Sequence, residues 1–229
     1  MNKDWLLLKG DFMNSLIIDC SAGMKVYLCA GENVISKIDE NQKKHTDELL
    51  LCVDELLKQA GLTVKDLDVV GMCEGPGSFT GIRVAISICK GLSVESKVKV
   101  VVASNFDIIQ HGITGDAVFV LDGFSEFVYV RKFVGGMTFD ECVNINDFAK
   151  EYFDELKNID VYAQNDVVKQ KLELLKIESK IAKNNTILCF KYKIENNLFI
   201  NINEINPIYL RASQAEIERN KKLNQTTGK

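Results

Sequence analysis

The residues of this sequence that most suggest chemistry are two carboxylates placed at the ends of predicted strands. Asp19 lies near the end of the apolar run 16–20, and Glu74 directly follows the apolar run 69–73. Paired carboxylates act as general acid and base in many enzymes. No nucleophile and base accompany these two residues, and a chain with 32 Asp and Glu residues supplies such pairs by chance. A carboxylate-driven reaction and a structural role therefore both stay open.

A second chemical signal is the glycine-rich segment 74–81, which joins a predicted buried strand to a predicted helix. Pro76 fixes φ at the first corner of a turn, and Gly77 can take the positive φ that a type II turn needs next. The helix that follows offers free amides and a dipole that attract anions. The segment matches neither a Walker loop nor a dinucleotide fingerprint. A tight connection without a ligand is the alternative to a phosphate or nucleotide loop, whose candidate residues are Gly75, Gly77, Ser78, Thr80 and Arg83.

Metal and nucleic-acid chemistry are not indicated by the remaining residues. The histidines at positions 45 and 111 are far apart and the seven cysteines form no Cys-x-x-Cys pair, so we expect no zinc site. The formal charge of −4 disfavours direct contact with a nucleic-acid backbone. The basic tail 211–229 is the exception, and it is also typical of a solvated helix end.

The cysteines and the hydropathy pattern indicate a cellular compartment. Most cysteines lie inside apolar runs, which is typical of reduced thiols in the core of a cytoplasmic protein. The chain has no apolar stretch of membrane-spanning length, and the run 5–8 is too short for a signal-peptide core. We therefore expect a cytoplasmic protein that makes no membrane contact.

The scaffold that positions these residues can be predicted from hydrophobic periodicity. An order of three strands, helix, strand, helix and strand indicates an α/β fold with a mixed sheet. The second half is less regular. The predicted strands are 16–20, 25–29, 34–38, 69–73, 98–103, 117–121 and 127–134, and the predicted helices are 46–60, 81–93, 147–156 and 166–176.

Three regions follow from this pattern. Residues 1–13 are a predicted N-terminal extension, because a second methionine, Met13, stands directly before the first convincing strand. Residues 14–105 are predicted to form an N-terminal lobe. Residues 106–229 are predicted to form a C-terminal lobe that ends in the basic tail.

The sequence from Gly71 to Val84 and on to Leu92 resembles the signature of the TsaB (formerly YeaZ) family of threonylcarbamoyladenosine biosynthesis subunits. The resemblance is dense over residues 14–103 and thin afterwards. Where the family usually carries an Asp-Ala-Arg-like run before a Glu-Val-Tyr strand, this chain has 122–129, which lacks the arginine. Weaker matches in the same order are 16–21, 45–50, 60–68 and 207–211.

The resemblance implies an actin-like, ribonuclease-H-like fold of two lobes with mixed sheets flanked by helices. It implies a non-catalytic subunit that supports threonylcarbamoyl transfer to the adenosine beside the anticodon of tRNA. The implied partners are the catalytic TsaD subunit and the TsaE ATPase, with tRNA reached through the complex and a homodimer when the partner is absent. No cofactor of its own is implied, and an adenine nucleotide at the subunit boundary stays open.

The resemblance also suggests that the helices at about 46–60 and 80–93 form the subunit contact. The first carries a long aliphatic stripe and the second many small residues, which permit close approach. We predict contact residues Leu49, Val53, Leu56, Ala85 and Cys89. Two alternatives remain: an independent enzyme of this fold, either a peptidase or an ATP-dependent kinase, and a stand-alone scaffold unrelated to RNA.

Overall fold

The computed structural model describes residues 13–39, 45–95, 97–152, 156 and 158–211. The predicted extension 1–13, apart from Met13, and the basic tail beyond Arg211 lie outside these residues.

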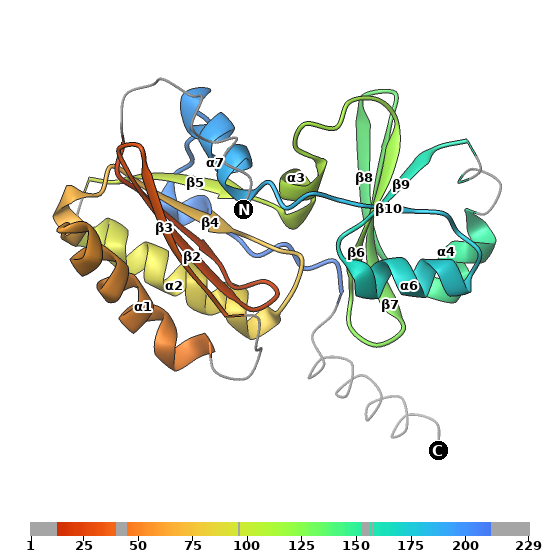
Figure 1. Ribbon diagram of the computed structural model, residues 1–229, viewed down its shortest axis with the longest axis horizontal. Helices are drawn as coiled ribbons and strands as arrows, with labels where there is room; N and C mark the ends of the chain where they lie inside the picture. The colour runs from red at the N-terminus through yellow and green to blue at the C-terminus, as the bar shows by residue number, and fades with distance from the viewer. Residues whose placement is uncertain (1–12, 40–44, 96, 153–155, 157, 212–229) are drawn as a thin grey trace, which may run out of the picture.

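Two five-stranded sheets dominate the fold, in the orders β3-β2-β1-β4-β5 and β10-β9-β6-β7-β8. In each sheet three antiparallel strands are extended by two parallel ones, so the second sheet repeats the topology of the first. Figure 1 shows the two sheets side by side, each with helices against it. The predicted two-lobe fold with mixed sheets is confirmed.

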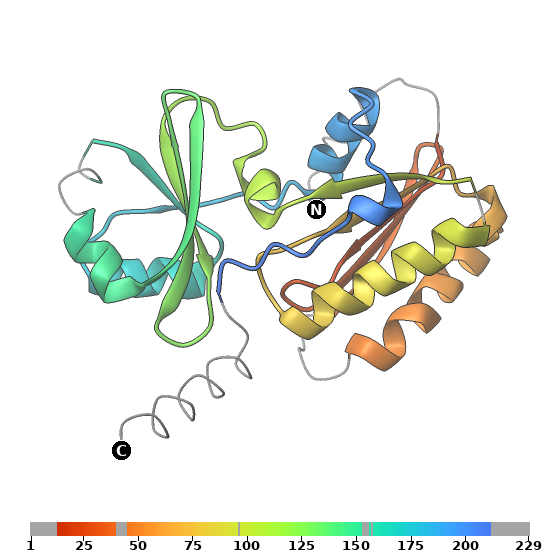
Figure 2. The same cartoon turned by 180° about the vertical axis from the view of Figure 1, so that it is seen from behind.

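The first sheet and its helices follow the predicted element order closely. The strands β1 and β4 are buried throughout, whereas the edge strand β3 is largely exposed. Gly61, at a φ of +69°, ends the first helix in the left-handed conformation that favours glycine. The helices α1 and α2 lie side by side on one face of the sheet (Figures 1 and 2). The elements are β1 (Ser15–Asp19), β2 (Met24–Ala30), β3 (Asn33–Asp39), α1 (His45–Ala60), η2 (Val64–Asp66), β4 (Val69–Cys73), α2 (Phe79–Glu95) and β5 (Lys99–Ala103).

The second half contains several elements that the sequence pattern did not predict. The predicted strands 117–121 and 127–134 and the helices near 147 and 166 are present, whereas α3, β8, β9, β10 and α7 were missed. The elements are α3 (Asn105–Gln110), β6 (Ala117–Asp122), β7 (Phe127–Val134), β8 (Met137–Asn144), α4 (Ile145–Glu151), β9 (Asp160–Ala163), α6 (Asp166–Leu174), β10 (Lys180–Ile181), α7 (Thr186–Glu195) and η3 (Ile202–Glu204).

The two lobes exchange the helix that follows the last strand of each sheet. The helix α3 comes after the first sheet, yet its Phe106 is buried with Phe119 of the second sheet. The helix α7 comes after the second sheet, yet its Phe190 packs on the first. Gly71 of β4 makes this possible, because a Cβ there would lie only 2.8 Å from the Phe190 ring. The predicted division of the chain at residue 105 stays a prediction. The helix α7 comes after this division in the sequence, although the sheet that it covers comes before it.

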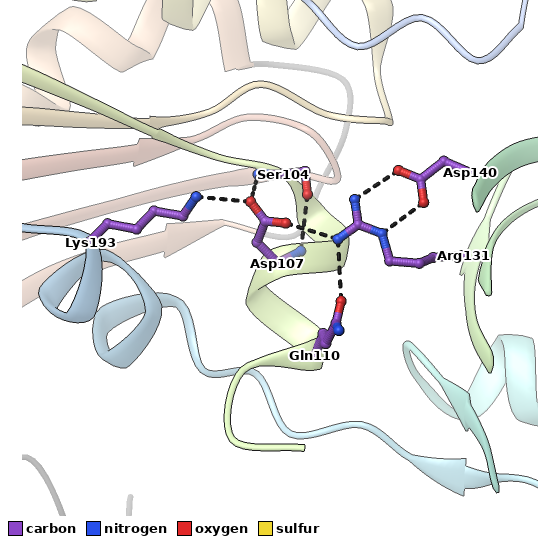
Figure 3. Close-up of polar contacts among 6 residues, drawn as sticks. All are labelled: Ser104, Asp107, Gln110, Arg131, Asp140 and Lys193. Carbon is purple, nitrogen blue, oxygen red and sulfur yellow. Dashed lines mark hydrogen bonds and ion pairs between the residues drawn. The ribbon is translucent and has the colours of Figure 1, made fainter. Parts of the chain in front are cut away.

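A network of charged side chains joins the exchanged helices to both sheets (Figure 3). The guanidinium of Arg131, on β7, donates to Asp140 through Nε and Nη2 at 2.7 Å each, and through Nη1 to Asp107 of α3 at 2.8 Å. Lys193 of α7 donates to the other oxygen of Asp107 at 3.0 Å. Asp107 also closes a capping box with Ser104 at the start of α3. One carboxylate thus ties a strand of the second lobe to a helix that covers the first.

The final described segment, residues 205–211, crosses from one lobe to the other, and we call it the C-terminal strap (Figure 2). Ile205 is buried in the core beneath α1 and α2. The amide of Ile208 donates to the Glu74 carbonyl at 2.8 Å. Arg211 then lies over the Phe127 ring of the second lobe and donates to the Gly123 carbonyl at 3.4 Å. The strap therefore contacts both lobes.

The charge of Asp107 gives the fold a defined acid sensitivity. Burial alone would raise the pKa of Asp107, but the hydrogen bond from Arg131 and the charge of Lys193 outweigh it and lower the pKa to about 2. A lowered folded-state pKa stabilises the fold above the ordinary value of 3.8, and this stability is lost as the pH falls toward 2. Asp107→Asn should cost about 2 kcal/mol at pH 7, since a tenfold change in the proton affinity of a carboxylate corresponds to about 1.4 kcal/mol.

Urea unfolding between pH 7 and pH 2 measures this effect. The difference in free energy of unfolding between wild type and Asp107→Asn should be constant above pH 5 and shrink between pH 4 and pH 2. Asp54→Asn is the control, because Asp54 is exposed and pairs with Lys58 on the surface of α1. A difference that persists unchanged at pH 2 would show that the charge of Asp107 is not its source.

Candidate functional site

The candidate site lies at the carboxyl ends of the three parallel strands of the first sheet. The strands β1, β4 and β5 run in the same direction, so Asp19, Glu74 and Ser104 all follow the same edge. Open α/β sheets bind their ligands at this edge. The glycine segment 75–77 and the start of α3 meet here, because the amide of Asn105 donates to the Gly75 carbonyl at 2.7 Å.

Asp19 is buried and is occupied by groups of this chain. Its Oδ1 accepts hydrogen bonds from the amide of Ser21 at 2.9 Å and from the Ser21 hydroxyl at 2.5 Å. Its Oδ2 accepts from the Lys25 ammonium at 3.2 Å. A carboxylate held by a lysine and a hydroxyl has its charge compensated and its lone pairs largely used. This arrangement favours the structural role for Asp19.

Glu74 differs from Asp19, because its side chain has no hydrogen-bond or ion-pair partner within the described residues. It is half-buried, and its backbone is hydrogen-bonded to Ile208 of the strap and to Ala103 of β5. Burial, helped by the nearby charge of Asp107, raises the pKa of Glu74, and Lys193 offsets only part of that rise. Glu74 is therefore the one carboxylate of the two that chemistry could still use.

The glycine segment is packed directly against the turn that follows β1. A Cβ on Gly77 would collide with the backbone oxygen of Ser21, and a Cβ on Gly81 with the backbone oxygen of Cys20. The amide of Ser78 donates to the Ser21 carbonyl at 2.7 Å. These glycines have a packing reason that needs no ligand, which favours the tight connection over the phosphate loop. Phosphate binding itself stays a prediction.

The other predicted loop residues lie as follows. The Ser78 hydroxyl accepts from the amide of Gly81 at 3.3 Å at the start of α2. Thr80 is exposed. Gly75 has a φ of +106°, and the Ile208 carbonyl oxygen lies 3.2 Å from where its Cβ would be. Arg83 stacks on the Phe79 ring and donates through Nε to the Tyr209 hydroxyl at 2.7 Å. Whether the loop and Arg83 bind one anion stays a prediction.

The predicted contact residues need correction. Leu49, Val53, Leu56, Ala85 and Cys89 are at most 4% exposed and belong to the core between the two helices and the first sheet. The reason is that the aliphatic stripe of an amphipathic helix is buried first by its own sheet. A protein that docks on the folded chain must meet other residues of these helices, and whether the helices form the contact stays a prediction.

The outward side of α2 carries a pattern that the sequence analysis missed. Residues that follow one another by alternating steps of four and three lie on one side of a helix, which is also the spacing of the seam between two packed helices. In the described part of the chain no atom lies within 4 Å of where a Cβ on Gly91 would be, and Val94 is 89% exposed. This spacing can be read from the sequence, but the apolar residues of the buried face form a denser pattern and are noticed first. We call this set the outer seam of α2: Thr80, Ser87, Gly91 and Val94, which are exposed, and Val84, which is half-buried and also packs against the core.

Other sequence expectations can be placed briefly. Five of the seven cysteines are buried and all seven are free thiols, and burial raises the pKa of Cys20 to about 12. In the part of the chain that the structure describes, no three metal-ligating side chains gather. No described helix combines the length and the apolar character needed to cross a membrane.

Removing the charge of Glu74 should stabilise the fold. A raised folded-state pKa means that the native state resists ionisation, so stability falls as the pH rises above the ordinary value of 4.5. Glu74→Gln should therefore raise the free energy of unfolding at pH 7 and have no effect near pH 3, with Glu32→Gln on an exposed turn as the control. Thermal unfolding at both pH values measures this. A loss of stability at pH 7 would show that the carboxylate has a compensating partner.

Comparisons with known proteins fit this geometry. A family model described as TsaD, tRNA N6-adenosine threonylcarbamoyltransferase, matches residues 33–198 of the 229. The chain is 39% identical over 79 residues to the tRNA threonylcarbamoyladenosine biosynthesis protein TsaB of Buchnera aphidicola subsp. Schizaphis graminum, a match that covers 34% of this chain and 38% of that protein. The match to TsaB of Escherichia coli is 30% identical over 70 residues and covers 31% and 30%.

These alignments span less than two thirds of the curated relatives, whereas the structural match is longer. The structure of YeaZ from Pseudomonas aeruginosa superimposes with a TM-score of 0.67 at 18% identity, covering 86% of this chain and all of that one, which shows a shared fold. The sequence matches to TsaB have the higher identity, over shorter segments. The chain therefore belongs to the family that the threonylcarbamoyltransferase model describes, and it is similar to the TsaB (YeaZ) proteins of tRNA threonylcarbamoyladenosine biosynthesis.

Proposed function

We propose that this chain is a non-catalytic partner subunit that supports threonylcarbamoyl transfer to tRNA by binding the catalytic transferase subunit. The observation that carries the proposal is the outer seam of α2. A glycine inside an exposed helix costs about 1 kcal/mol relative to alanine, and no neighbour of Gly91 among the described residues requires it. Close approach by a helix of another chain would explain the glycine.

The neighbouring helix α1 also exposes apolar side chains. Leu50 and Leu51 of α1 are 58% and 62% exposed, although the rest of the apolar stripe of α1 is buried. The two helices pack against each other on one face of the first sheet. We call the outer seam of α2 together with Leu50 and Leu51 the docking face. Small residues flanked by exposed leucines are suited to helix packing between subunits.

The candidate site supports binding over catalysis. Asp19 is compensated by Lys25, and Asp107 is compensated by Arg131 and Lys193. These cations belong to the chain itself and hold the carboxylates in fixed hydrogen bonds. An acid or base must be free to exchange a proton with a substrate, so this arrangement disfavours a role for either group. The TsaE ATPase, the homodimer and an adenine nucleotide at the subunit boundary stay predictions.

One observation favours an independent enzyme, namely the unpaired and half-buried Glu74. The test is to delete the gene and measure threonylcarbamoyladenosine in bulk tRNA by mass spectrometry. We expect the modified nucleoside to fall and to be restored by wild type and by Glu74→Gln. Restoration by wild type but not by Glu74→Gln would support the enzyme. An unchanged level of the nucleoside would support a scaffold unrelated to RNA.

A pair of arginine substitutions in α2 should separate docking from folding. Gly91→Arg should stabilise the helix by roughly 1 kcal/mol, because arginine has the better helix propensity, yet it should abolish association with the transferase subunit. Ala85→Arg should instead lower the free energy of unfolding by roughly 4 kcal/mol or more, because Ala85 is fully buried. Circular dichroism and analytical ultracentrifugation of the mixture measure the two effects.

The matched control is Gln170→Arg, which places the same side chain on an exposed position of α6 in the other lobe. It should alter neither folding nor association. Unimpaired association of Gly91→Arg would contradict the proposed docking face.

A further inference from the structure

Arg83 stands on the exposed side of α2, one turn before Ser87 in the outer seam, and its side chain is held in one position. Its guanidinium carbon lies 3.8 Å from the centre of the Phe79 ring, so the guanidinium is stacked on the aromatic face. Its Nε donates to the Tyr209 hydroxyl at 2.7 Å. These two contacts fix both the plane and the direction of the guanidinium.

The group that holds Arg83 is itself anchored. The Phe79 and Tyr209 rings stack with their centres 4.4 Å apart and an interplanar angle of 22°. Tyr209 belongs to the C-terminal strap. The residue before it, Ile208, is hydrogen-bonded through its backbone amide to Glu74. An arginine on a free surface loses considerable rotamer entropy when it binds. Arg83 has already lost much of it, so it is pre-organised for a ligand.

Arg83 has donors left over. A guanidinium carries five N–H groups, of which Tyr209 uses one. No carboxylate pairs with Arg83 among the described residues, whereas Lys58 and Lys37 pair with Asp54 and Glu55. An exposed, oriented and unpaired guanidinium at the end of a helix-packing seam is suited to a bidentate carboxylate.

We propose that Arg83, positioned by Phe79 and Tyr209, receives a carboxylate side chain from the partner helix that packs on the docking face. This inference rests on the proposed function. It adds that Arg83 sets the register of the packed partner helix and the choice of partner. Tyr209 is a positioning residue, which couples the C-terminal strap to docking.

A protein carboxylate fits these surroundings better than an RNA phosphate. On this side of α2 Arg83 is followed by Ser87 and Gly91, with Val84 and Ile88 beside them, and the other cation of the helix, Lys90, lies two turns along. Binding to a nucleic-acid backbone relies on several cations that act together. Subunit interfaces, in contrast, often place one arginine beside an apolar core.

The experiment measures binding of the full chain to the purified transferase subunit of the same genome by isothermal titration calorimetry. Arg83→Gln should weaken binding about tenfold or more and reduce its dependence on salt. Arg83→Lys should weaken it nearly as much, because lysine lacks the planar fork. Tyr209→Phe keeps the ring stack and removes the acceptor, and it should weaken binding about threefold to tenfold. Lys65→Gln, at an exposed lysine outside α1 and α2, should have no effect.

Combining Arg83→Gln with Tyr209→Phe tests the positioning role. The second substitution should add no further loss, whereas a general structural role of Tyr209 would give the same loss in both backgrounds. Arg83→Glu should abolish binding, and replacing one acidic residue of the transferase by arginine should restore it.

The outcomes that overturn the inference are distinct from those that overturn the proposed function. Loss of binding with Gly91→Arg but not with Arg83→Gln would refute the role of Arg83 and leave the docking face intact. Absence of binding by wild type would refute both. Direct binding of wild type to tRNA in a filter assay, weakened by Arg83→Gln while transferase binding is unchanged, would assign the guanidinium to RNA.

Discussion

The structure depends on a direct backbone contact between the glycine segment and the turn after β1. Gly77 and Gly81 leave no room for a Cβ against Ser21 and Cys20. This contact fixes where α2 begins, because Ser78 donates to Ser21 and also accepts from Gly81. Once the start of α2 is fixed, its buried residues face the sheet and its outer seam faces away. Any side chain larger than hydrogen at these positions would move the helix and everything placed on it.

The exchange of α3 and α7 between the lobes imposes a second constraint. Each helix covers the sheet of the opposite half, so neither half buries all of its apolar surface alone. Asp107 lies where the exchanged helices meet and binds a cation from each side. The C-terminal strap then crosses from the first lobe to Phe127 of the second. The arrangement of the two lobes is therefore set by packing and by charge together. The strap connects both lobes to the start of α2.

Sequence reasoning recovered the elements whose signal is local. Gly61 marks the end of α1, and the segment around Pro76 and Gly77 marks the passage from strand to helix. It missed α7, whose β-branched and aromatic residues favour a strand by propensity, because the helix is stabilised by Phe190 packing on Gly71. It missed β8, an edge strand without a regular alternation of apolar and polar residues. The network around Asp107 could not be predicted, because its members are brought together only by the exchange of helices.

The predicted contact surface failed at the residue level for a related reason. An apolar stripe on a helix shows that the stripe is buried, but it does not show what covers it. In α1 and α2 the sheet of the same chain covers Leu49, Val53 and Ala85. The information about a partner lies in the residues that the fold does not explain, such as a glycine with empty space around it and an arginine some of whose donors have no acceptor among the described residues. A surface for another protein is therefore better sought among unexplained exposed residues than among the most apolar ones.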